Sequence, residues 1–179
     1  MSTGPLALVL PTIFGELVLG SPDPGARTFV LNQGDSGLLA ALDRLSAAAA
    51  SATYEGGASI ASHVDHLRYG LSLLNRWGDG VSPPWPDMDW TASWKHTVVS
   101  EEEWRALRDA LRHEASRWIV VLSAARDLTE VEAGWLVGSV AHLAYHLGAI
   151  RQIDRLTRGP SAEDEAHAQS KSRQAAQES

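Results

Sequence analysis

The sequence predicts an all-α fold: a four-helix bundle with an N-terminal extension and a long loop, rich in tryptophan and proline, between the second and third helices. Apolar residues recur at intervals of three and four over long stretches, which is the pattern of helices with one buried face. Residues that cap helices stand at the starts of these stretches. No stretch alternates apolar and polar residues as strands do. The expected helices cover residues 36–52, 60–77, 101–126 and 130–157.

The helix starts follow from capping residues, whose side-chain oxygens accept hydrogen bonds from the free N–H groups of the first turn. Asp35 or Ser36 precedes the first helix, and Ser59 precedes the second. The third and fourth helices begin with capping boxes, in which a Ser or Thr is followed three residues later by Glu. These boxes are Ser100 with Glu103 and Thr129 with Glu132.

Three regions are expected along the chain. Residues 1–34 form an N-terminal arm and linker, residues 35–158 form the bundle, and residues 159–179 form a polar tail that we expect to be disordered. Within the arm, residues 1–20 are expected to be a short helix or irregular, because Pro11 breaks a long helix. The apolar side chains of the arm are expected to pack on the bundle or on a second subunit.

The loop between the second and third helices covers residues 78–97 and contains three prolines and three tryptophans. Long ordered loops inside compact domains are usually functional. Three indole rings expose too much apolar surface to remain in water, so we expect Trp85, Trp90 and Trp94 to pack over the bundle. A structural cover is the favoured interpretation, and a role in stacking on a substrate is the alternative.

The composition argues against several classes of protein. Hydrophobic residues make up 44% of the 179 residues, which is enough for a packed core. A net charge of −7 argues against nucleic acid as a partner, since phosphate binding needs a basic surface. The chain contains no cysteine, so a metal site must use His, Asp or Glu. The apolar N-terminus lacks an early basic residue and no apolar run is long enough to span a membrane, so we expect a cytoplasmic protein.

The stretch with the clearest chemical signal is Ser139–Leu156, which contains His142 and His146. Positions four apart on a helix lie on one face, about 5–6 Å apart at Cβ, so both imidazoles can reach one metal ion. Two ordinary helix histidines are the alternative interpretation. A third ligand would come from the second helix, where His63 and His66 both fall within the apolar arc, so the spacing leaves both open.

The order of these histidines resembles that of the DinB/YfiT-like superfamily, whose members hold a metal with three histidines in a four-helix bundle. The resemblance covers about residues 36–157: a histidine on the second helix is followed far downstream by HxxxH on the last helix. In that family the first of these histidines lies about two turns after a Ser or Thr cap. Ser59 stands seven residues before His66, which favours His66 as the first ligand. The resemblance therefore implies a ligand set of His66, His142 and His146.

Three neutral imidazoles leave an open coordination position on a metal, which suits catalysis more than a structural role. All-imidazole ligation suits several divalent metals, of which zinc and nickel are expected here. The expected function is that of a metal-dependent enzyme, a thiol S-transferase or a hydrolase, since the superfamily includes enzymes that use low-molecular-weight thiols. The alternative is a non-catalytic, stress-related metal-binding bundle, and a helical interaction domain without metal is a third interpretation. A homodimer is also expected.

No general base is evident from the sequence. His96, His113 and His167 are expected to be solvated, because they lie in a loop, on a helix of mixed character and in the tail. Five further residues are candidates for the surroundings of the ligands, although each is expected to be an ordinary surface or core residue: Asp43, Asp65, Tyr69, Tyr145 and Asp154.

Overall fold

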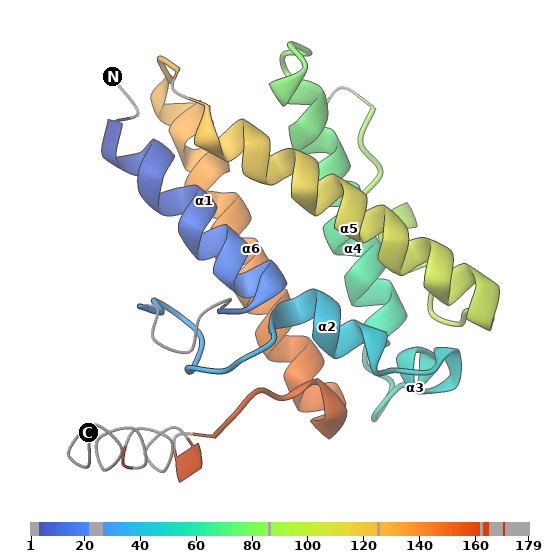
Figure 1. The fold of residues 1–179 in the computed structure, drawn as a ribbon. Coiled ribbons are helices and arrows are strands. Elements are labelled where there is room, and N and C mark those ends of the chain that lie inside the picture. Colours follow the sequence, from blue (N-terminus) through green and yellow to red (C-terminus); the bar gives the residue numbers. More distant parts are fainter. Residues whose placement is uncertain are drawn as a thin grey trace.

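The computed structural model describes residues 4–21, 27–85, 87–124, 126–161, 163–164 and 170. Within these ranges the chain forms six α-helices, two short 3-10 helices and no β-strand, which confirms the predicted all-α class (Figure 1). The expected disorder of residues 159–179 concerns a segment that lies mostly outside the described residues. The elements in order are α1 (Gly4–Leu19), α2 (Gly37–Asp43), α3 (Ala47–Ser51), α4 (Ile60–Gly78), η1 (Ala92–Trp94), α5 (Glu101–Ser123), α6 (Glu130–Ile153) and η2 (Arg155–Thr157).

Four long helices surround the core. α1 packs against α5 and α6, and α4 packs against the same two helices, so the order around the core is α1, α5, α4, α6. Figure 1 shows α5 crossing in front of α4, with α1 to the left of both. The short helices α2 and α3 lie between α1 and α4 in the sequence, and both contact α5. α4 and α6 are thus direct neighbours, although α5 separates them in the sequence.

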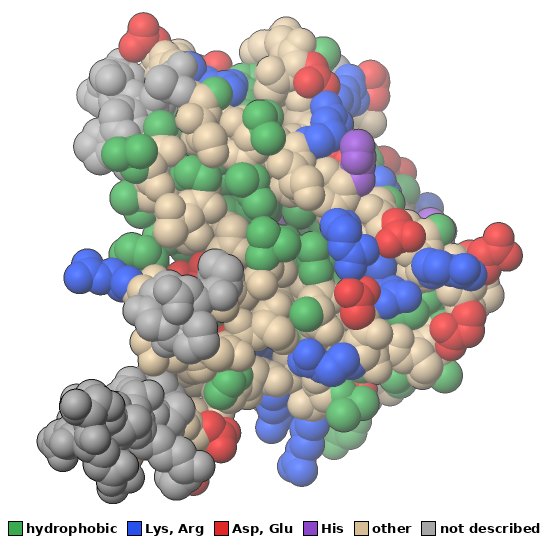
Figure 2. Space-filling view, in the orientation of Figure 1, with side chains coloured by type: hydrophobic (Ala, Val, Ile, Leu, Met, Phe, Trp, Pro, Cys, Tyr) green, Lys and Arg blue, Asp and Glu red, His purple; other side chains and the backbone are tan. Residues whose placement is uncertain are grey.

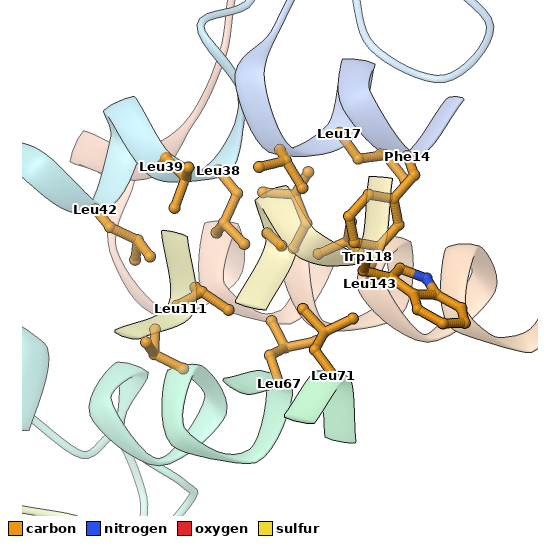
Figure 3. Packing of buried hydrophobic residues seen from close by; sticks show 14 of the residues in the cluster. Phe14, Leu17, Leu38, Leu39, Leu42, Leu67, Leu71, Leu111, Trp118 and Leu143 are labelled. Carbon is orange, nitrogen blue, oxygen red and sulfur yellow. The ribbon is translucent and has the colours of Figure 1, made fainter. Parts of the chain in front are cut away.

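A core of buried apolar side chains fills the space between the helices (Figure 3). Phe14 and Leu17 of α1 and Trp118 of α5 are fully buried in it. Each side chain of this kind contributes about 1.5–3 kcal/mol when it leaves water. Leu67 of α4 and Leu143 of α6 belong to the same core, and each directly follows a histidine in the sequence. The core therefore determines how the two histidine-bearing helices face one another.

α1 is a continuous helix with Pro11 inside it, in contrast to the break expected there. A proline in a helix interior costs roughly 3 kcal/mol. Burial of the apolar face of α1 outweighs this cost, because each buried side chain contributes about 1.5–3 kcal/mol. The buried side chains are Leu10, Phe14, Leu17 and Val18. α1 is thus part of the helical core and packs on the domain itself, the first of the two expected arrangements.

Residues 36–52, expected as one helix, form the two short helices α2 and α3. Ser46 caps α3 by accepting a hydrogen bond from the backbone N–H of Ala49 at 3.2 Å. The carbonyl of Leu45 accepts a hydrogen bond from the indole of Trp104 on α5 at 2.9 Å. The periodicity predicted one continuous helix here. The helix is divided because the side chain of Ser46 bonds to the backbone and because Trp104 of α5 bonds to the carbonyl of Leu45.

The other predicted helix starts are confirmed. Ser59 caps α4, and the two predicted capping boxes begin α5 and α6. α6 ends at Ile153 and not near residue 157. The side chain of Asp154 accepts a hydrogen bond from the N–H of Leu156 at 2.7 Å, and this cap starts the 3-10 helix η2.

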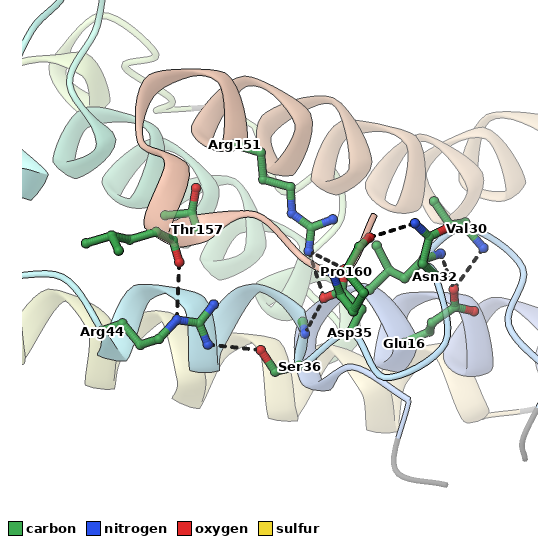
Figure 4. A network of polar contacts seen from close by, with 12 residues as sticks. Glu16, Val30, Asn32, Asp35, Ser36, Arg44, Arg151, Thr157 and Pro160 are labelled. Carbon is green, nitrogen blue, oxygen red and sulfur yellow. Dashed lines mark hydrogen bonds and ion pairs between the residues drawn. The ribbon is translucent and has the colours of Figure 1, made fainter. Parts of the chain in front are cut away.

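Two buried carboxylates connect segments of the N-terminal part of the chain with one another and with α6 (Figure 4). Arg151 donates to both oxygens of Asp35 at 2.8 Å, and the backbone N–H of Gly37 donates to Asp35 at 2.9 Å. Ser36 occupies the N-cap position of α2 but makes no side-chain cap hydrogen bond, and the side chain of Asp35 accepts from the first N–H of the helix instead. Glu16 accepts hydrogen bonds from the backbone N–H groups of residues 29–31 at 2.6–2.8 Å. We call Glu16 and Asp35 with these partners the carboxylate network.

Charged side chains of both signs are interspersed over the face that α5 presents in Figure 2, and hydrophobic side chains are more frequent toward α1. Ion pairs connect α5 with α2, since Arg108 and Arg112 bond to the two oxygens of Asp43 at 2.7 and 2.9 Å. None of the described helices combines the length and the apolar character that crossing a bilayer requires.

Candidate metal centre

Four histidines from α4 and α6 meet inside the protein. His63 and His66 lie in the first two turns of α4, and His142 and His146 lie in the second half of α6. Three of them are buried, and His142 is partly buried. Because α4 packs on α6, the buried faces of the two helices bring these rings to one place. We call the four residues the histidine cluster.

Three of the four histidines direct a ring nitrogen to one point. The Nε2 atom of His142 lies 2.9 Å from Nε2 of His146 and 3.2 Å from Nε2 of His66. Ligand atoms of these three residues all lie within 4.8 Å of one another, so the group could hold a metal ion. The spacing in the sequence left His63 and His66 open as alternatives, and the structure brings His66 to this point.

The ring of His66 is held by its surroundings. Its Nδ1 lies 2.9 Å from the hydroxyl of Ser93, and that hydroxyl donates to the carbonyl of Trp90 at 2.7 Å. Because the hydroxyl proton is directed at the carbonyl, the hydroxyl oxygen accepts from His66, which assigns the ring proton to Nδ1. The lone pair of Nε2 then faces the other histidines. Trp94 stacks on the same ring, with centroids 4.4 Å apart and planes inclined by 25°.

His63 holds the ring of His146 in a similar way. The Nδ1 atoms of the two rings lie 2.8 Å apart, so one of them donates a hydrogen bond to the other. With the proton on Nδ1 of His146, the Nε2 lone pair of His146 also faces the point where the three rings meet. His63 is then the acceptor, and it orients a candidate ligand without being one.

Burial favours the neutral form of all four imidazoles. Burial and, after it, the neighbouring histidines lower the pKa of His66 to about 4 and that of His146 to about 3. Burial also lowers the pKa of His63 and the pKa of His142. At neutral pH the rings are therefore uncharged, which is the form in which imidazole binds a metal.

A cation fits this arrangement better than hydrogen bonds alone. If Nε2 of His66 and Nε2 of His146 both carry lone pairs, a single proton on Nε2 of His142 can be donated to only one of them. A divalent ion would accept the lone pairs of all three rings together. The Nε2 separations of 2.9 and 3.2 Å are slightly shorter than about 3.4 Å, the spacing of two nitrogens on one tetrahedral zinc ion. The donor set and its spacing therefore fit a divalent metal.

The tryptophan-rich loop packs over the bundle, as the sequence predicted, and two of its rings contact the histidine cluster. Trp90 and Trp94 contact the ring of His66, and Trp85 packs edge-on against Trp135 of α6. Sequence reasoning missed the contribution of Ser93, which lies in η1. No pattern in the loop marks this serine, because only the packing of η1 on α4 brings its hydroxyl to a histidine.

Asp65 and His96 form a contact that the sequence did not predict. The ring of His96 is exposed, as expected for a solvated residue, but its Nδ1 bonds to the buried carboxylate of Asp65 at 2.6 Å. The other oxygen of Asp65 accepts a hydrogen bond from Arg68 at 2.8 Å. Both oxygens of Asp65 are therefore hydrogen-bonded to residues outside the histidine cluster.

The other candidate surrounding residues have separate environments. Tyr145 is exposed and lies edge-on to His146, with ring centroids 5.0 Å apart. The hydroxyl of Tyr69 accepts a hydrogen bond from the backbone N–H of Asp89, while Asp43 pairs with α5 and Asp154 caps η2. His113 is exposed on α5, and His167 lies outside the described residues.

The geometry of the site is that of a group that could hold a metal ion. Three neutral imidazoles meet at one point, their orientations are held by Ser93 and His63, and tryptophan side chains pack against them.

Compared with protein-family models, with curated proteins and with solved structures, the chain gives no match.

Proposed function

We propose that this protein is a divalent-metal-binding member of the DinB/YfiT-like four-helix-bundle superfamily, with His66, His142 and His146 as ligands. The observation that supports the metal site is the approach of three ligand atoms from two helices to within 4.8 Å of one another. The superfamily assignment is supported by the order of the histidines and by the ring of four long helices. α1, and not the segment 36–52, supplies the first of these helices.

Zinc or nickel is the proposed ion, because all-imidazole ligation suits metals of this kind. A divalent ion with three protein ligands keeps a position for a substrate and supplies the Lewis acidity that deprotonates water or a thiol near neutral pH. The chain itself contributes neutral imidazoles, ring orientations set by Ser93 and His63, and indole rings that limit the access of water.

The proposed activity is that of a metal-dependent enzyme, a thiol S-transferase or a hydrolase, with a low-molecular-weight thiol as a candidate substrate. Screening the zinc- or nickel-loaded protein for thiol conjugation and for ester hydrolysis tests this activity. Cytoplasmic location and a homodimer are also proposed, and they rest on the sequence. Gel filtration with light scattering tests the dimer.

A non-catalytic metal-binding protein is the second candidate, and one observation favours it. The buried carboxylate next to His66 in the sequence, that of Asp65, bonds to Arg68 and His96 and not to the histidine cluster. It is therefore not placed to take a proton from a substrate at the cluster. Turnover no greater than that of the free metal in both assays would favour this second candidate.

Elemental analysis of the purified chain, before and after replacement of one histidine, tests the metal site. His142 is the residue to replace, because its Nε2 lies close to Nε2 of both other rings. We expect about one equivalent of divalent metal per chain in the parent and a roughly tenfold or greater loss in His142→Ala. His113→Ala removes an exposed histidine of α5 and is the matched control, with metal content unchanged. Equal metal in the parent and in His142→Ala would contradict the assignment.

A further inference from the structure

A cavity of about 420 Å³ adjoins the histidine cluster. It lies between α4 and α6, and Trp85 and Trp90 of the loop complete its wall. His66 and His142 are part of the same wall, so the cavity reaches the candidate metal centre directly. Its volume lies in the range of cavities that bind small molecules, roughly 300–1,000 Å³.

The wall of the cavity is apolar except at the two histidines. Leucine, glycine and tryptophan make up most of it, and among the described residues no carboxylate, lysine or arginine lines it. The hydroxyl of Ser139 also lines it, but this group donates to the carbonyl of Leu136 at 2.7 Å and accepts from the indole of Trp118 at 2.9 Å. The cavity thus has an apolar body and one polar end.

Three tryptophans provide flat apolar surfaces around this body. Trp85 lies edge-on to Trp135 with ring centroids 5.5 Å apart, and Trp90 is tilted against Trp85 at 6.2 Å. All three side chains are partly exposed, so the protein leaves part of each ring uncovered. Indole faces of this kind stack on planar apolar groups.

Two glycines of α6 widen the cavity beside the histidines. Gly134, Gly138 and His142 follow at intervals of four residues, so they lie along one side of the helix. A Cβ atom at Gly134 or Gly138 would meet no other atom within 4 Å, and both residues line the cavity. Glycine is unfavourable inside a helix, and no neighbouring element approaches closely enough to require it here. The missing side chains therefore leave space next to the histidine.

We propose that this cavity binds the uncharged, planar apolar part of a substrate whose polar atom faces His66 and His142. The placement of the polar atom rests on the proposed metal centre. The substrate class is a compound with a small, neutral aromatic group. A charged group inside the cavity would lose its hydration and find no partner in the wall. Charged groups of a substrate therefore have to remain outside the cavity.

A matched pair of fluorescent probes tests the cavity on the protein as purified, whatever its metal content. N-phenyl-1-naphthylamine is uncharged, and 8-anilinonaphthalene-1-sulfonate has the same aromatic framework with an added sulfonate. We expect the neutral probe to bind roughly tenfold more tightly, or better. Gly134→Leu should weaken its binding by roughly tenfold or more, because the new side chain fills the cavity. Gly148→Leu makes the same change at an exposed glycine of α6 outside the cavity and should leave binding unchanged.

Circular dichroism shows whether each variant folds, and Gly138→Leu replaces Gly134→Leu if the latter does not fold. The proposal is overturned if the neutral probe does not bind, if the sulfonate binds as tightly, or if the filling variant binds the neutral probe as the parent does.

A second pair of probes tests the connection between the cavity and the metal centre. Benzohydroxamate and acetohydroxamate carry the same metal-binding group, but only the first carries an aromatic ring. On zinc- or nickel-loaded protein, benzohydroxamate should bind roughly tenfold more tightly, and Gly134→Leu should remove this advantage. Equal binding of the two hydroxamates by the parent would overturn the connection.

The two proposals can fail separately. If elemental analysis finds no metal and the neutral fluorescent probe behaves as expected, the proposed metal centre fails and the apolar cavity is supported. If the chain holds about one equivalent of metal and the neutral probe does not bind, the cavity proposal fails and the metal centre is supported.

Discussion

The histidine cluster and the carboxylate network are both buried polar groups, and both use residues of α6, but their atoms are matched differently. In the carboxylate network, N–H donors of Arg151 and of the backbone point at the oxygens of Asp35 and Glu16 (Figure 4). In the histidine cluster, the Nε2 atoms of three neutral rings face one another. In the carboxylate network every carboxylate oxygen faces an N–H donor, and the buried atom without a partner is a donor, Nε of Arg151. The histidine cluster instead has more acceptors than protons to share.

This difference separates a structural group from a ligand site. Burial alone does not distinguish the two, since Asp35 is 2% exposed and His146 is 1% exposed. Nearly all buried polar groups in folded proteins are paired, so a matched set needs no explanation beyond stability. A set of buried acceptors that face one another needs a proton or a cation between them. The comparison can be tested by changing each group and measuring both stability and metal binding.

The largest expected effect comes from breaking the carboxylate network. Asp35→Ala leaves the guanidinium of Arg151 without its carboxylate, and removal of one partner of a buried ion pair lowers the free energy of unfolding by about 3–5 kcal/mol. Urea denaturation measures this loss, and metal content should remain that of the parent.

The control for this prediction is Asp43→Ala, which removes an exposed carboxylate that pairs with Arg108 and Arg112. Its expected cost is no more than about 1 kcal/mol. Equal losses of unfolding free energy in the two variants would show that the buried carboxylate of Asp35 contributes no more to stability than an exposed one.

A smaller effect is expected from removing the residue that orients a ligand. His63→Leu takes away the acceptor for Nδ1 of His146 and should lower metal affinity by about 10–100-fold, or about 1.4–2.7 kcal/mol. Competition with a chelating dye measures the affinity. His63→Gln keeps a hydrogen-bond acceptor and should recover part of the loss, whereas His96→Gln, at an exposed ring that bonds to Asp65, should have no effect. Parental affinity in His63→Leu would rule out an orienting role.

A further effect concerns the pH dependence of the stability of the metal-free protein. Burial and nearby histidines lower the pKa of His66 to about 4 and that of His146 to about 3, from an ordinary value of 6.5. As the pH falls below 6.5, the unfolded chain takes up protons that the folded chain does not. Stability is therefore fully present above this value and decreases toward pH 4, by about 1.4 kcal/mol per pH unit for each such proton.

Urea midpoints measured across this window check the prediction. His113→Gln, at an exposed position of α5, should follow the parent at every pH. A midpoint that is constant between neutral pH and about pH 4.5 would mean that the cluster is not held in its neutral form.

Several features could be predicted because their causes are local. Ser59 and the capping boxes of α5 and α6 act on N–H groups within three residues, so their effect does not depend on the rest of the chain. The spacing of His142 and His146 places them on one face of any helix. Other features depend on distant contacts: the bond from Trp104 to Leu45 divides the segment 36–52, and burial keeps α1 helical through Pro11.

The sequence by itself determined the helical class, most of the helix starts and the histidine pair of α6, because these follow from interactions within one or two turns. The family resemblance favoured His66 as the first ligand, but only the tertiary structure places its ring beside this pair and brings Nδ1 of His63 to Nδ1 of His146. Both residues lie on the buried side of α4, three positions apart, and hydrophobicity does not distinguish them. The packing of α4 on α6 does, because it determines which ring meets the pair and leaves the apolar cavity beside it.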